Sequence, residues 1–169
     1  MLFWLICAIP LRLSRFGVDT RRIAMAGHSM GGWVVAHTAA HDHGLIGAVL
    51  ISAGDMGRVG ELPSEKAAAL MADNMESLAG VTAESMAAEV KERSKEFRME
   101  NAATGLAQMP LLAITSDDGL APDTDALVKE IKAKGGHNVT VMHMATDHSY
   151  SDHRIALESA VITWLGGLR

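Results

Sequence analysis

One short segment constrains the fold of this chain more than any other. An apolar run at residues 23–26 leads directly into the hexapeptide GHSMGG at residues 27–32, and a helix-like run at residues 33–41 follows it. A G-x-S-x-G pattern in this setting is typical of a sharp turn from a strand into a helix. We expect Gly27 and Gly31 to let the strand and the helix approach closely, because neither residue has a side chain.

Ser29 is the candidate nucleophile, since this turn would leave its hydroxyl exposed. The helix that begins beside it presents unpaired N–H groups and the positive end of its dipole, which favour a developing oxyanion. The expected donor is the backbone N–H of Met30. The alternative is a glycine-rich turn in which Ser29 only caps the helix. We expect His28 to point away along the strand, and we assign it no catalytic role.

Strand-like and helix-like runs alternate along the rest of the chain. Apolar runs of strand length occupy residues 47–53, 111–115 and 139–144, and helices are expected at 123–134 and 154–165. The alternation predicts an α/β fold, in which a mostly parallel sheet of about four strands is flanked by helices. The last helix should pack through an apolar stripe, formed by Ile155, Leu157, Val161, Ile162 and Leu165.

The length of 169 residues predicts a single domain, residues 1–169. Residues 57–108 interrupt the alternation and are rich in Ala, Glu, Lys and Met, which favours an inserted helical cap over the site. Ser64 and Thr82 are the expected N-caps of two helices there. Residues 1–14 form an atypical apolar N-terminal segment that is too short to span a bilayer.

Composition narrows the possible partners. A net charge of −5 gives no electrostatic case for nucleic acid, and we expect no stable membrane insertion. The lone Cys7 excludes an internal disulfide and is typical of a cytoplasmic protein, with an export or anchoring segment at the N-terminus as the alternative. No phosphate loop, dinucleotide motif or cysteine-based metal site is present, so neither a cofactor nor a metal is expected. The alternative metal pair is His37 and His41, four residues apart.

The GHSMGG segment and the residues that follow later strands resemble the α/β-hydrolase family. In that family an acid follows a later strand and a histidine follows the last strand. The resemblance implies that Ser29 is the nucleophile, His148 the base and Asp118 the acid that orients it. Asp118 begins a D-x-x-x-P pattern that is common in the family and ends here at Pro122. Asp117 fits if the position is counted from the strand end, and it is the alternative acid.

His153 is the rival of His148, but we expect it to enter the last helix. The implied function is a serine hydrolase that cleaves an ester or related acyl bond of a small substrate through an acyl-enzyme. A serine peptidase or an acyltransferase would use the same triad. A third hypothesis is a catalytically impaired hydrolase fragment that acts as a binding or assembly module.

The resemblance extends from about Arg15 to Leu168 and covers only the second half of the family's fold. We therefore expect a partial fold without the N-terminal strands and without the loop that donates the second oxyanion N–H. The strand before Ser29 would then be a sheet edge, through which two copies could form a homodimer. A missing donor of this kind lowers the rate by about 100- to 1,000-fold.

Overall fold

The computed structural model describes residues 19–72 and 79–168, so the expectations for residues 1–14 lie outside the described residues. Four strands form one sheet in the order β1-β2-β3-β4, and every neighbouring pair is parallel. This confirms the predicted α/β architecture. The strands are β1 (Ile23–His28), β2 (Leu45–Ile51), β3 (Leu111–Ser116) and β4 (Val139–Met144).

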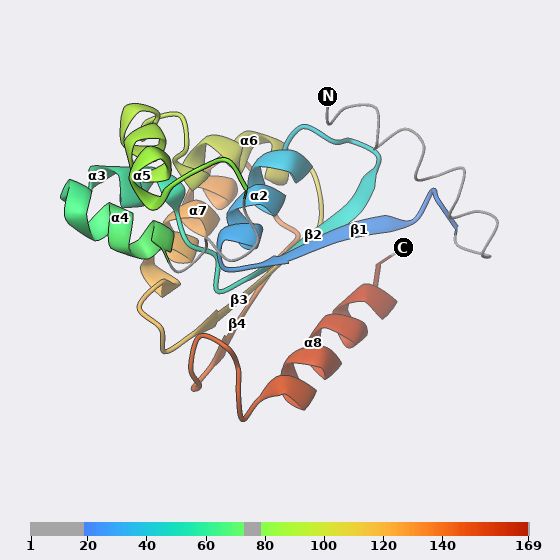
Figure 1. The fold of residues 1–169 in the computed structure, drawn as a ribbon. Helices are drawn as coiled ribbons and strands as arrows, with labels where there is room; N and C mark the ends of the chain where they lie inside the picture. The colour runs from blue at the N-terminus through green and yellow to red at the C-terminus, as the bar shows by residue number, and fades with distance from the viewer. Residues whose placement is uncertain (1–18, 73–78, 169) are drawn as a thin grey trace.

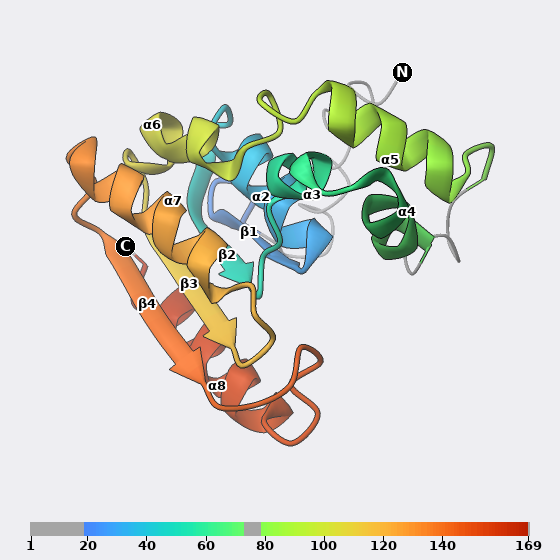
Figure 2. The ribbon, with the colours of Figure 1, turned by 90° about the vertical axis from the view of Figure 1, so that its left-hand side faces the viewer.

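Helices cover both faces of this sheet (Figures 1 and 2). One face carries α2 (Met30–Ala39), α6 (Ala103–Leu106) and α7 (Ala121–Ala133), with the 3-10 helix η3 (Met99–Ala102) between them. The other face carries α8 (Arg154–Gly166). Successive residues of β2 pack against the helices on opposite faces of the sheet, because side chains alternate along a strand. Leu50 packs with the first group of helices, whereas Val49 packs beneath α8.

The stretch between β2 and β3 is helical, as expected. It contains α3 (Met56–Glu61), α4 (Ser64–Ala72) and α5 (Ala83–Glu92), followed by η3 and α6. Thr82 caps α5, because its hydroxyl accepts a hydrogen bond from the backbone N–H of Ser85 at 3.1 Å. The three helices share a small apolar core of their own, formed by Met56, Ala67, Met71, Ala87 and Val90.

The apolar stripe predicted for α8 is wrong at Ile155 and Ile162, and Leu165 is also partly exposed, at 36%. Ile155 is 81% exposed and Ile162 is 64% exposed. Leu157 and Val161 pack on the sheet as predicted, together with Trp164, which the prediction did not include. These two groups lie on different sides of the helix, since residues seven apart share a face. Only one side of α8 meets the sheet, so the apolar residues on its other side stay in solvent.

β1 lies at one edge of the sheet, and none of its residues is fully buried. This agrees with the expectation that the strand before Ser29 would be a sheet edge, since among the described strands β1 has a neighbour on one side only. Association of two copies through this edge stays a prediction. Among the described residues, no helix is long and apolar enough to cross a membrane.

Candidate active site

Ser29 occupies the turn between β1 and α2 with an unusual backbone conformation. Its φ is 57° and its ψ is −126°, a strained combination for a residue with a side chain. The turn is held from the sheet, because the Ser29 N–H donates a 2.9 Å hydrogen bond to the carbonyl of Ile51. A Cβ atom on Gly27 would overlap the Gly31 carbonyl and lie 2.8 Å from the Val35 side chain. Only glycine at position 27 permits this close approach.

The second close approach is made by Gly32 and not by Gly31. A Cβ atom on Gly32 would lie 2.6 Å from the Cβ atom of Ala53, in the turn after β2. A Cβ atom on Gly31 would meet no described atom within 4 Å. The expected packing role of Gly31 is therefore wrong. The contribution of Gly31 to the contact with Gly27 is its backbone, which any residue would supply.

The turns after all four strands meet at one cavity of about 630 Å³. This confirms the expectation that they converge, since the carboxyl ends of parallel strands lie at the same edge of the sheet. Ser29 and Met30 line the cavity together with Asp118 and His148. The Met30 N–H belongs to the first turn of α2, where N–H groups have no partner within the helix. The remaining lining is largely apolar and comes mainly from the helices that follow β2: Met56, Val59, Leu62, Leu70, Met71 and, beyond β3, Leu120.

His148 is paired with Asp118. The Nδ1 atom of His148 lies 2.7 Å from Oδ2 of Asp118, whose side chain is only 5% exposed. Burial alone would raise the pKa of the Asp118 carboxyl. Hydrogen bonds from His148 and from the Leu120 N–H outweigh this effect, so the pKa lies below its ordinary value. Asp118 is therefore a carboxylate at neutral pH, and it fixes the tautomer of the imidazole.

The alternative residues lie elsewhere. Asp117 is 63% exposed and accepts a hydrogen bond from Nε2 of His143 at 3.0 Å. His153 is the residue before α8, and its Nδ1 lies 2.9 Å from Asp152. The structure thus brings Ser29, His148 and Asp118 to one cavity, and it places neither alternative residue in the cavity lining.

The expectation that His28 points away from the site is wrong. Its Nε2 lies 2.7 Å from the backbone carbonyl oxygen of His148, and the two imidazole rings have centroids 4.5 Å apart. Residue 28 is the last of β1, and the chain turns sharply at Ser29. The side chain of His28 therefore faces the loop after β4, a neighbour that the local sequence does not reveal.

A network of buried hydroxyl groups near the His148–Asp118 pair was also not predicted from the sequence. The Tyr150 side chain is 1% exposed, and its hydroxyl lies 2.9 Å from Oγ of Ser52, which in turn lies 2.9 Å from Oγ of Ser116. Ser52 and Tyr150 have positive φ angles of 41° and 52°. The chain has a single tyrosine, placed two residues after His148, and that position was the available signal.

Asp55, Arg58 and Asp123 form a charged wall of the cavity, and Arg98 and Glu100 pair with this wall without lining the cavity themselves. Asp55 is 1% exposed, and Nε of Arg98 lies 3.3 Å from its Oδ2. Arg58 pairs through Nε with Asp123 at 2.9 Å, and Glu100 lies 2.7 Å from Nη2 of Arg98. Burial raises the pKa of Asp55 to about 6. This wall joins the turn after β2 to η3 and α7.

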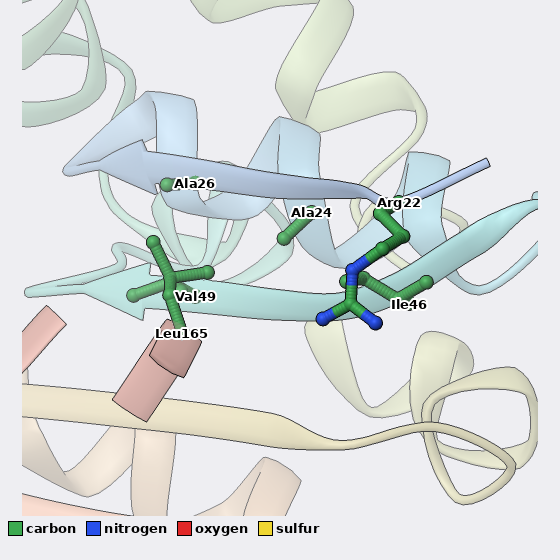
Figure 3. Close-up of a pocket in the computed structure, with 6 residues that line it drawn as sticks. All are labelled: Arg22, Ala24, Ala26, Ile46, Val49 and Leu165. Carbon is green, nitrogen blue, oxygen red and sulfur yellow. The ribbon is translucent and has the colours of Figure 1, made fainter. Parts of the chain in front are cut away.

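A second hollow, of about 360 Å³, lies on the α8 side of the sheet (Figure 3). Its lining contains Arg22 but no serine, carboxylate or histidine, so it has none of the groups needed for nucleophilic catalysis. Within residues 19–72 and 79–168, no three His, Cys, Asp or Glu side chains are grouped so that they could hold a metal ion.

Comparison with protein families gives one match. Residues 3–152 match the model of a family described as having the alpha/beta hydrolase fold. None of the curated proteins compared with the chain matches it.

Solved structures share the fold at low sequence identity. An esterase from Pyrococcus furiosus is 17% identical with a TM-score of 0.59, and the match covers 88% of this chain and 54% of the esterase. An acylaminoacyl peptidase from Pyrococcus horikoshii is 14% identical with a TM-score of 0.65, over 89% of this chain and 24% of the peptidase. A monoacylglycerol lipase from Paleococcus ferrophilus is 15% identical with a TM-score of 0.63, over 95% of this chain and 72% of the lipase. The chain thus spans about half the length of the esterase.

Proposed function

Because the chain belongs to the α/β-hydrolase family, we propose that it is a serine hydrolase that cleaves esters of small substrates through an acyl-enzyme. In this proposal the turn at Ser29 is a nucleophile elbow. The observation that carries the proposal is the 2.7 Å pair between His148 and Asp118, at the same cavity as a serine held with positive φ.

The proposed reaction follows from the atoms available. Ser29 Oγ attacks the acyl carbon while Nε2 of His148 takes its proton, and Asp118 stabilises the imidazolium that forms. The Met30 N–H donates to the oxyanion. His148 then returns the proton to the leaving alcohol. A water molecule repeats the sequence to release the acid and restore Ser29. Since Nδ1 of His148 is bonded to Asp118, the imidazole is oriented with Nε2 available for the serine.

The cavity supports a substrate with an apolar acyl group. Most of the side chains contributed by α3 and α4 are aliphatic or methionine, and methionine adapts to different shapes. In this proposal residues 57–108 act as the cap over the site. The structural neighbours with the same fold include an esterase and a lipase, which agrees with an ester substrate.

The test is hydrolysis of short-chain p-nitrophenyl esters by the purified chain and by Ser29→Ala. We expect hydrolysis by the unchanged chain, loss of that activity in Ser29→Ala, and unchanged activity in Ser149→Ala, an exposed serine beside His148. An active-site-directed phosphonate should label the unchanged chain and not Ser29→Ala.

Other outcomes would change the proposal. Hydrolysis of N-acyl aminoacyl anilides in place of esters would indicate a peptidase with the same triad. A folded chain that neither hydrolyses these substrates nor reacts with the phosphonate would contradict the proposal and favour the impaired fragment.

A further inference from the structure

The residue next to the proposed nucleophile is hydrogen-bonded to the main chain of the proposed base. A carbonyl oxygen can only accept, so Nε2 of His28 carries the proton and donates it to the His148 carbonyl at 2.7 Å. We propose that His28 is a positioning residue, which sets the place of the His148 imidazole relative to Ser29. This inference rests on the proposed function, in which His148 is the base.

The loop that carries His148 needs such a contact. His148 lies between β4 and α8, and its side chain is 38% exposed. The loop is anchored on either side of it: Thr146 accepts from the Asp117 N–H at 3.0 Å, and the Tyr150 hydroxyl is bonded to Ser52. Among the described residues, the bond from His28 is the hydrogen bond that holds the main chain of His148 itself.

The hydrogen bond between His28 and His148 links the proposed nucleophile to the loop of the proposed base. His28 and Ser29 are consecutive, so one covalent link and one hydrogen bond join the serine to the base loop. The serine end is rigid, because the sheet holds the Ser29 N–H and Gly27 is packed against α2. The Asp118 bond orients the ring but comes from a different strand end. A displacement of about 1 Å between reacting groups costs about 100-fold in rate.

The ring of His28, although exposed, also lies near two rings of the loop. Its centroid lies 4.5 Å from that of His148, and 6.3 Å from that of Tyr150 in an edge-to-face arrangement. A smaller residue would lose both the donor and this packing. Glutamine would keep a donor at the end of a side chain of similar reach. The two substitutions therefore separate the hydrogen bond from the mere presence of histidine.

The experiment compares the ester kinetics of the unchanged chain with those of three variants. In His28→Ala we expect kcat to fall by about 10- to 100-fold with KM nearly unchanged, because the chemistry and not the binding is misaligned. His28→Gln should recover most of kcat. His43→Ala, an exposed histidine away from the cavity, should behave like the unchanged chain. A normal kcat in His28→Ala, a change in KM alone, or no recovery in His28→Gln would overturn the inference.

A second readout separates this inference from the proposed function. Amide hydrogen exchange of residues 147–151 should be faster in His28→Ala than in the unchanged chain, and close to normal in His28→Gln. If the unchanged chain hydrolyses no ester, the proposed function fails but this readout still applies. Unchanged exchange in His28→Ala would then overturn the positioning role.

Discussion

At the scale of single residues, the site is defined by small differences between neighbours in the sequence. Asp117 and Asp118 are adjacent and chemically identical, yet one is exposed and pairs with His143 while the other is buried and pairs with His148. Adjacent residues at a strand end point in different directions, so one position decides which carboxylate reaches the imidazole. The two aspartates can therefore serve as controls for each other.

Asp118→Asn should reduce kcat by about 10³- to 10⁴-fold, because an amide does not stabilise the imidazolium and favours the wrong tautomer of His148. Asp117→Asn should leave kcat unchanged, since this carboxylate is solvated. Steady-state ester kinetics of the two variants check both expectations. Equal losses of kcat in the two variants would contradict the assignment of the acid.

At the scale of elements, α2 connects the site to the helices after β2. Its first turn begins beside Ser29, and three residues later Trp33 donates a 2.6 Å hydrogen bond to the carbonyl of Phe97. His37 lies one turn further, with its ring 4.9 Å from that of Trp33. The Nε2 atom of His37 is buried. Burial lowers the pKa of His37.

This depressed pKa predicts a loss of stability in mild acid. Below pH 6.5 the unfolded chain binds a proton at His37 before the folded chain does, so stability falls as the pH falls through this window. Each unit by which the pKa is lowered corresponds to about 1.4 kcal/mol. His37→Gln should therefore lose less stability than the unchanged chain between pH 7.5 and pH 5.5, measured by urea unfolding. His43→Gln should retain the full loss, and an identical loss in His37→Gln would refute the prediction.

At the scale of the whole molecule, two groups of elements share the cavity between them. The turns after β1, β3 and β4 supply the proposed reacting groups, Ser29, Asp118 and His148, and α3 and α4 supply most of the apolar wall. The charged wall joins the two groups. Asp55 caps α3 by accepting from the Gly57 N–H at 2.8 Å, and it also contacts Arg98, just before η3. The arginines around Asp55 compensate its buried negative charge, so removal of this carboxylate would leave their positive charges without a partner.

Asp55→Ala should lower the free energy of unfolding by about 3 kcal/mol, through the loss of the cap and of the ion pair. Asp55→Asn should lose less, because its amide oxygen still accepts from Gly57. Asp19→Ala removes an exposed pair with Arg21 and should have no measurable effect. Urea unfolding of the three variants provides the comparison. A similar stability of Asp55→Ala and Asp19→Ala would show that this wall does not hold the molecule together.

Local sequence patterns established the order of the elements and the residue types at the strand ends. The run at residues 111–115 predicted β3 to within one residue, because a strand buried in a parallel sheet is continuously apolar. The run at residues 139–144 predicted β4 at its observed bounds, although β4 is an edge strand whose residues are mostly exposed. The glycine pattern predicted the turn at Ser29. The D-x-x-x-P pattern pointed to Asp118, the carboxylate that the structure places beside His148. These are local signals, carried within a few residues of chain.

The contacts between segments far apart in the chain became visible only in the folded molecule. His28 contacts a residue 120 positions away, Tyr150 reaches Ser52 across 98 positions, and Gly32 packs against Ala53 in the turn after β2. α8 has an exposed apolar side because the sheet covers only its opposite side. Each of these contacts depends on which elements become neighbours when the sheet forms. Local periodicity indicates the direction of a side chain but not the residue that it contacts.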